Sequence, residues 1–264
     1  KDYFRIINIT ENLFKNLART LNFLHRKKIS ETEWRIILYP WLIQFVTIIF
    51  DRWQTSENFL KKNYKKRFIL NYIKSNENVL ECLDHLDFAK KSLNHKWNNY
   101  IYKEIFNYLE SKIIIKKKII IEKKNKEKKD KSKILQLMKL NVNKIALNIS
   151  FYFNSILFES FLFPKKFFYP ICLKNRILPT KFVFYKTIGS KKYDKKLRKI
   201  GYSIINKKKS NKNKFENFLY KEIFNYMPLS YLENFEEMYK KSMKLPAKKI
   251  IFTMHSSQWN DFFK

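Results

Sequence analysis

The sequence predicts a helix-rich α/β fold, and three observations support this prediction. Apolar residues recur at helical spacing through residues 1–28, and residues 36–50 are apolar on nearly every side of a helix. Residues 181–187 alternate apolar and polar side chains, as a half-buried strand does. Residues 249–253 form a short apolar strand, which a polar turn joins to a helix starting near Gln258. This strand, turn and helix are typical of the start of an α/β unit.

The clearest single element is the helix that begins after Ser30. Ser30 and Glu33 have the spacing of a capping box, in which each side chain binds the backbone amide of the other residue. Ile29 and Trp34 fit a hydrophobic staple around this cap. We therefore expect a helix with a well-defined start and a buried body.

The chain divides by composition into three parts. Residues 1–112 form a helical part, residues 113–133 a basic low-complexity loop, and residues 134–264 a helical and α/β part that ends in an incomplete strand-turn-helix unit. Within the last part, residues 134–163 are predicted to be a buried helix. Because the chain opens on Lys1 and closes where a helix has barely begun, we expect an internal piece of a longer protein.

The charge of the chain is strongly basic, with 56 Lys+Arg against 23 Asp+Glu and a net charge of +33. Only eight of these basic residues are arginine, and the residues that dominate the chain (Lys, Asn, Ile, Phe, Tyr) have AT-rich codons. A nucleic-acid groove uses arginine more often, because its planar fork reads phosphate and guanine bidentately. Genome bias therefore explains the lysine excess better than nucleic-acid binding does, although the resulting field would still attract anionic lipids or phosphorylated substrates.

The familiar catalytic and metal-binding patterns are absent from the sequence. With only Gly189 and Gly201, the chain cannot build a glycine-rich phosphate loop, so we expect no nucleotide cofactor bound in that way. Cys82 and Cys172 are isolated, which argues against zinc and against a disulfide framework and makes a cytoplasmic location the default. The segment 84–87 (Asp-His-Leu-Asp) could be imagined as a metal site, but an exposed helix surface is the simpler interpretation. We therefore expect neither a metal nor another cofactor.

Three places could carry chemistry, and the first comprises His25, Ser30, Trp34 and Arg35. An arginine in an apolar helix needs a carboxylate, a carbonyl or a ligand phosphate as partner. An internal pair with Asp51 or Glu33 is the structural alternative to a substrate contact.

The second place is the pair Asp51 and Arg52, where charges return after the apolar helix. The pair could bind substrate, or it could simply mark the end of the helix, where the negative helix terminus favours Arg52. The third place comprises Thr253, His255, Ser256 and Ser257. Ligands of α/β sheets bind where strands end and helices begin, but Ser256 or Ser257 could equally be a helix cap.

Taken together, these segments resemble a known family, the transferases encoded in bacterial O-antigen and related surface-polysaccharide gene clusters. The resemblance is carried in the family's order by Leu-Asn-Phe-Leu-His at 21–25, Ser30-x-x-x-Trp-Arg-Ile-Ile-Leu-x-Pro-Trp-Leu at 30–42, Phe-Asp-Arg-Trp at 50–53, Trp-Asn-x-Tyr-Ile-Tyr at 97–102, Pro-Leu-Ser-Tyr-Leu-Glu-x-Phe at 228–235, and Leu-Pro at 245–246 with Ile-Ile-Phe-Thr at 250–253. The chain departs from the family pattern at Tyr39, where a glycine is usual. The family's next element, Gln-His-Gly-Gly, would fall beyond Lys264.

The resemblance implies a partial Rossmann-like lobe of a two-lobed glycosyltransferase-like enzyme with a large helical part. It implies a transferase that uses an activated sugar or a lipid-linked saccharide at the inner face of the plasma membrane, with a peripheral contact to anionic lipid and no specific nucleic acid. His25, Arg35 and Arg52 would orient phosphate or sugar groups, and His255 would be the acid or base. One competing interpretation is a basic nucleic-acid-binding protein, which would place aromatic residues among basic ones on an exposed face. Another is a non-catalytic, membrane-associated scaffold, in which His25, Arg35 and Arg52 would not meet in a concave site.

Overall fold

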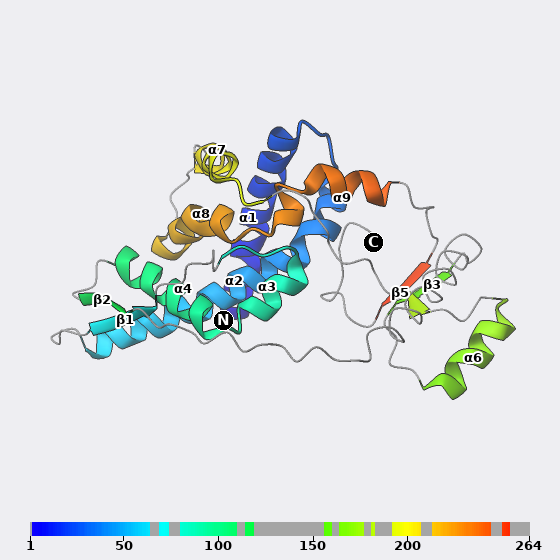
Figure 1. Ribbon diagram of the computed structural model, residues 1–264, viewed down its shortest axis with the longest axis horizontal. Helices are drawn as coiled ribbons and strands as arrows, with labels where there is room; N and C mark the ends of the chain where they lie inside the picture. The colour runs from blue at the N-terminus through cyan, green and yellow to red at the C-terminus, as the bar shows by residue number, and fades with distance from the viewer. Residues whose placement is uncertain are drawn as a thin grey trace, which may run out of the picture.

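The computed structural model describes residues 2–63, 80–109, 164–176, 192–206 and 213–243, and the backbone of five short strands. Figure 1 shows a body of packed helices, to one side of which lie helix α6 and strands β3 and β5.

The first half of this body is a helical hairpin with two further helices packed beside it. Helix α1 (Asp2–His25) packs against the long helix α2 (Glu31–Lys62). Arg26 ends α1 in the left-handed conformation, at φ 52°, and Ser30 caps the start of α2 as the sequence predicts. Helices α3 (His85–Lys91) and α4 (His95–Tyr108) then pack along α2.

The second half of the body comes from much later in the chain. Helix α7 (Lys195–Asn206) packs on both α8 (Lys214–Tyr226) and α1. A single 3-10 turn (Leu229–Tyr231) leads into α9 (Phe235–Ser242), while α6 (Lys165–Lys174) lies outside this group. The buried core cluster runs from Ile9 to Met238 and includes residues of α1, α2, α3, α4, α7, α8 and α9.

Aromatic side chains fill this core. Trp41, Phe88, Trp97 and Tyr226 form a chain of rings, with centroids 6.0 Å, 5.9 Å and 5.5 Å apart from one to the next. Burial raises the pKa of Tyr226 well above its usual value. Twelve large aromatic side chains are fully buried in the described residues. This burial does not favour a nucleic-acid surface, which would be built from exposed rings.

Five strands accompany the helices, all in parallel pairs. Strand β1 (Ile69–Ile73) pairs with β2 (Ile114–Lys118), and β3 (Ile156–Glu159) lies between β4 (Lys181–Phe182) and β5 (Ile250–Thr253). Strands therefore form within the segments 181–187 and 249–253, as predicted, but β3 lies inside the segment predicted to be a buried helix.

The predicted fold class, an α/β Rossmann-like lobe, is wrong for the described part of the chain. The hydrophobic core of the described residues consists of helices and the short connections next to them. A Rossmann-like lobe would instead place a central parallel sheet between layers of helices. Short strand patterns do not show how distant elements pack, and in the described residues helix-to-helix packing forms the framework.

Helix α2 has the length and hydropathy of a membrane-spanning helix, and half of its most apolar window is buried inside the protein. Its buried side chains pack against α1, α4 and α8. Because α2 packs against these helices, its apolar side chains are explained by its position in the core.

Candidate functional site

The predicted residue Ser30 acts as a helix cap. Its Oγ accepts the Glu33 amide at 3.2 Å, and a Glu33 carboxylate oxygen accepts the Ser30 amide at 2.8 Å. The Ser30 hydroxyl also donates to Glu33 at 2.6 Å, and these bonds lower the pKa of the Glu33 carboxyl. The capping box is confirmed, and it satisfies the hydrogen-bonding groups of Ser30 within the protein.

His25 and Trp34, two residues of the first predicted place, lie together in a packed cluster. The His25 ring stacks on Phe235 at a centroid distance of 4.0 Å, and Trp34 lies against the same ring at 5.2 Å. His25 Nε2 lies 3.0 Å from the Tyr231 carbonyl oxygen, so this nitrogen carries a proton. Trp34 is fully buried and donates to Asn22 at 2.9 Å. The cluster joins the end of α1 to the start of α9.

Arg35 has an internal partner, but this partner is not Asp51 or Glu33, the two we had considered. Its guanidinium binds both carboxylate oxygens of Glu11 on α1, at 2.7 Å and 2.9 Å, and lies over the Phe14 ring at 4.6 Å. The Arg35 hydrogen bond lowers the pKa of Glu11. Burial, followed by the bond to Glu11, raises the pKa of Tyr39 to about 12. A substrate phosphate would have to displace Glu11 to reach the fork of Arg35.

Asp51 and Arg52 do not mark the end of the apolar helix, since α2 continues to Lys62. Arg52 binds Asp51 at 2.5 Å and donates through Nε to Asn98 at 3.0 Å. Asn98 in turn donates to the Ser92 carbonyl at 2.9 Å. Arg52 therefore ties α2 to the start of α4, and it connects two of the sequence blocks on which the resemblance rests.

The predicted site residues whose side chains the structure describes do not line a single cleft. The helical rise places Arg52 about 25 Å along α2 from Arg35. Thr253 ends strand β5, while His255 and Ser256 lie outside the described residues. Only His25 of the predicted residues lines a hollow found in the described part of the structure.

The segment 84–87 forms a helix start. Asp84 caps α3 by accepting the Asp87 amide at 2.8 Å. His85 is buried beside Gln44, at 2.8 Å, so the interpretation of an exposed helix surface is wrong for this residue. The described residues contain no group of three side chains placed to hold a metal ion.

A buried ion pair that we did not predict lies between α7 and the start of α9. Arg198 binds both carboxylate oxygens of Glu233, at 2.6 Å and 2.8 Å, and donates to the Phe224 carbonyl at 2.5 Å. The Tyr193 ring lies over the guanidinium at 4.1 Å, and the Asp194 amide donates to Glu233 at 3.0 Å. Such a charge pair is stable in the interior only because its remaining donors and acceptors are also satisfied.

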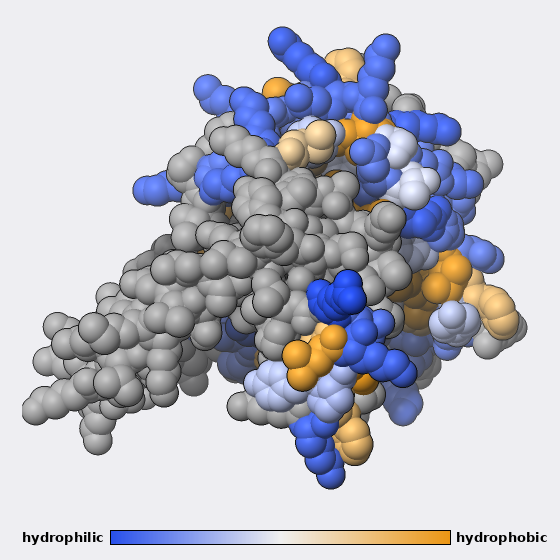
Figure 2. All heavy atoms as spheres, turned by 90° about the vertical axis from the view of Figure 1, so that its right-hand side faces the viewer, coloured by the Kyte–Doolittle hydropathy of each residue, from blue (hydrophilic) through white to orange (hydrophobic). Residues whose placement is uncertain are grey.

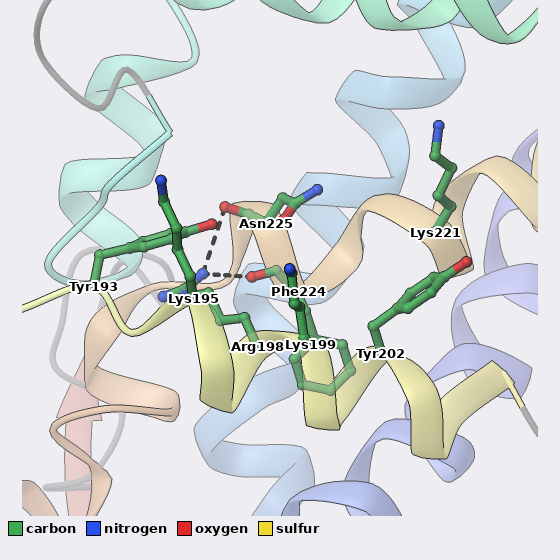
Figure 3. A pocket seen from close by; sticks show the side chains of 8 residues that line it. All are labelled: Tyr193, Lys195, Arg198, Lys199, Tyr202, Lys221, Phe224 and Asn225. Atoms are coloured by element: carbon green, nitrogen blue, oxygen red, sulfur yellow. Dashed lines mark hydrogen bonds between the residues drawn. The ribbon is translucent and has the colours of Figure 1, made fainter.

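A hollow of about 380 Å³, which we call the basic hollow, opens beside this pair between α7 and α8. Figure 3 shows its lining side chains, which come from both helices and from Tyr193 just before α7. They are Tyr193, Lys195, Arg198, Lys199, Tyr202, Lys221, Phe224 and Asn225. None of these residues is acidic, so the hollow presents lysine ammonium groups and tyrosine hydroxyls.

Gly201 brings the two helices of the basic hollow close together. A Cβ at this position would overlap the ring of Phe224, a residue that is 1% exposed and lines the hollow. Glycine is therefore required for this spacing of α7 and α8.

A second hollow of about 460 Å³, which we call the mixed hollow, lies on the other side of the ion pair, where Glu233 rather than Arg198 forms part of the wall. It is also lined by His25, Asp194 and Glu236. Asp194 caps the start of α7 by accepting the Lys196 amide at 2.8 Å, and Glu236 lies 3.8 Å from Lys27. Its acidic groups are thus already engaged with protein groups.

One signal in the sequence could have located the ion pair. Arg198, Gly201 and Ile205 share one face of a helix by their spacing, and all three are buried. An arginine on the inward face of a helix requires a buried carboxylate, and Glu233 is the acidic residue of the Pro-Leu-Ser-Tyr-Leu-Glu block.

The comparisons with known proteins bear on the whole chain. Neither the curated proteins nor the solved structures gave a match. A family model described as LIC12162 family transferase matches residues 1–264. This match confirms the transferase assignment that the sequence blocks suggested, and the chain belongs to the LIC12162 family of transferases.

Proposed function

We propose that this transferase binds a phosphate-activated sugar through the basic hollow and takes part in the synthesis of a bacterial surface polysaccharide. The observation that carries the proposal is the lining of the basic hollow: lysines from two helices line it, and no carboxylate does. The surface-polysaccharide role rests on the sequence blocks that resemble transferases of O-antigen gene clusters.

The electrostatics of the basic hollow suit a phosphate or diphosphate group. Lys195 and Lys199 are exposed and have no acidic partner among the described residues, whereas Lys221 lies 3.6 Å from Glu222. Lysine is a mobile point charge with three donors, which lets it follow a flexible phosphate chain. Tyr202 adds a hydroxyl and a ring face to the same wall.

The same lysines would assist the transfer step. In sugar transfer the bond between the sugar C1 and the phosphate oxygen breaks, and a hydroxyl oxygen of the acceptor forms a bond to C1. The phosphate leaves with the electron pair, and the hydroxyl proton passes to a base, for which His255 stays the sequence-based prediction. Cationic side chains placed at the leaving phosphate stabilise the charge that develops there.

Direct binding of pyrophosphate and of a nucleoside diphosphate tests the proposal by titration calorimetry. Lys199→Ala and Lys195→Ala should each weaken binding by about tenfold, as expected for a lost charge-assisted hydrogen bond. Lys196→Ala is the matched control, because Lys196 is also exposed on α7 but does not line the hollow.

Two results would count against the proposal. One is equal loss of binding in Lys196→Ala and Lys199→Ala, which would indicate a diffuse field rather than a site. The other is tighter binding of an oligonucleotide than of the diphosphate, with a steep salt dependence spread over many lysines. The second result would favour the nucleic-acid interpretation.

A further inference from the structure

Helix α6 exposes a group of apolar side chains that the helical core does not cover. Leu173 is 72% exposed, Phe167 51%, Tyr169 43% and Ile171 40%. Single exposed apolar residues are ordinary on protein surfaces, but four on one helix of ten residues are not.

The apolar residues cover both flanks of the helix. Phe168 and Cys172 are four residues apart, so they share one face, and both are buried. At 100° per residue, Phe167 and Ile171 lie on one side of this face, and Tyr169 and Leu173 lie on the other. The outward surface of α6 is therefore apolar on two flanks, and Pro170 lies between them with Lys166 and Lys174 one turn before and after it.

Basic residues stand at both ends of this surface. Lys166 lies in the first turn of the helix, Lys174 ends it, and Arg176 follows Asn175, while residues 164–176 contain no Asp or Glu. The Lys166 ammonium group lies 4.9 Å from the Phe167 ring centroid, so charged and apolar groups are neighbours. Figure 2, which faces the side where α6 lies in Figure 1, shows hydrophobic and strongly hydrophilic residues next to one another.

An aromatic and aliphatic surface with cations at its ends fits the boundary between lipid headgroups and acyl chains. There the rings and aliphatic side chains enter the acyl region while lysine and arginine reach back to the phosphates. A helix of ten residues is too short to cross a bilayer, so it would lie in the plane of the surface. Residues 164–176 contain basic side chains and no acidic ones, so an anionic membrane would attract this segment.

We propose that α6 docks the protein on membranes that contain acidic phospholipids, with Phe167, Tyr169 and Leu173 inserted at the interface. This proposal stands on the exposure and charge of α6 and does not depend on what the basic hollow binds. The partner is the lipid surface itself.

Flotation of the protein with lipid vesicles tests the proposal. The protein should float with vesicles of phosphatidylcholine and phosphatidylglycerol far more than with pure phosphatidylcholine, and added salt should reduce the bound fraction. The double variant Phe167→Ser/Leu173→Ser should weaken vesicle binding by more than about tenfold. Lys166→Glu should weaken it by about fivefold or more.

Two control variants separate α6 from the general charge and apolar surface of the chain. Leu93→Ser removes a side chain that is 83% exposed elsewhere, and Lys96→Glu reverses a charge at the start of α4. Both should bind vesicles nearly as the unaltered protein does. Equal binding by the α6 variants and the unaltered protein would overturn the proposal, as would an equal loss in the control variants. Because the α6 side chains exchanged are exposed, circular dichroism should show unchanged helix content in all variants.

Discussion

Two arginine–carboxylate pairs join distant parts of the helical body, and they differ in exposure rather than in geometry. Arg35 and Glu11 bind through two hydrogen bonds, as Arg198 and Glu233 do. The first pair has side chains that are 40% and 32% exposed, and the second has side chains that are 3% and 1% exposed. The two pairs therefore make similar hydrogen bonds, but water reaches the first pair and is excluded from the second.

The difference shows which arginine can be changed at little cost. Water can solvate Arg35 or Glu11 when its partner is lost, so the pair contributes little to the free energy of unfolding. Water cannot reach Arg198 or Glu233 in the same way, so the loss of either leaves a buried charge. The sequence motif drew attention to Arg35, but the buried pair is the one that stands beside the basic hollow.

The largest expected effect comes from breaking the buried pair. Arg198→Met should lower the free energy of unfolding by about 3–5 kcal/mol, because Glu233 stays buried without its cation. Urea unfolding followed by circular dichroism measures this loss. Arg35→Met is the matched control and should lose less than about 1 kcal/mol. Equal losses in the two variants would remove the distinction between the pairs.

The double variant Arg198→Met/Glu233→Leu sharpens the same comparison. Replacing both charges with apolar side chains should restore much of the stability that Arg198→Met loses, because no unpaired charge remains. A double variant less stable than Arg198→Met would mean that the pair itself, rather than the leftover charge, supplies the stability.

Substitution at Gly201 should have the next largest effect. Gly201→Ala places a methyl group against the Phe224 ring, and this overpacking should cost about 1–3 kcal/mol despite the better helix propensity of alanine. Thermal unfolding measures the change. A stabilised Gly201→Ala would show that α7 and α8 can separate freely at the basic hollow.

Glu222 is buried like Glu233, but the described residues give it no arginine partner; its nearest cation is Lys221, at 3.6 Å. Burial is the main cause that raises the pKa of Glu222, so the folded state holds its proton more firmly than the unfolded state does. The unaltered protein should therefore lose stability as pH rises from the ordinary carboxyl value through the raised pKa. Glu222→Gln should lack this loss and should therefore be more stable at neutral pH. Unfolding curves over a series of pH values measure it, and a less stable variant at neutral pH would contradict the assignment.

The smallest effect is expected at Glu11. Arg35 lowers the pKa of Glu11, so the pair's contribution is present above the ordinary carboxyl value and is lost as pH falls through the lowered pKa. Glu11→Gln should therefore cost less than about 1 kcal/mol at neutral pH and almost nothing in acid. A cost that persists in acid would show that the side chain matters through packing instead of charge.

The local features of the fold were the most predictable from sequence, because they depend on neighbouring residues. The capping box at Ser30, the helix before it and the strand at 250–253 follow from spacing alone. The fold class did not follow, because contacts between distant helices decide it. No local pattern indicates that α8 packs on α2, or that Phe235 stacks on His25.

The candidate site was less predictable for the same reason. Arg35 was correctly expected to need a partner, but Glu11 comes from a different helix and no spacing rule selects it. The basic hollow depends on the angle and separation of α7 and α8, which Gly201 sets through contact with Phe224. The inward position of Arg198 was visible in the sequence, but the convergence of lysines from two helices was not.

Hydrogen exchange of the protein with and without pyrophosphate tests the central claim, that the anion site lies beside the buried pair. The account predicts slower exchange in α7 and α8, around Lys199 and Lys221, and little change at the α1–α2 junction near Arg35. Slower exchange at that junction, or no change in α7 and α8 at saturating pyrophosphate, would contradict it.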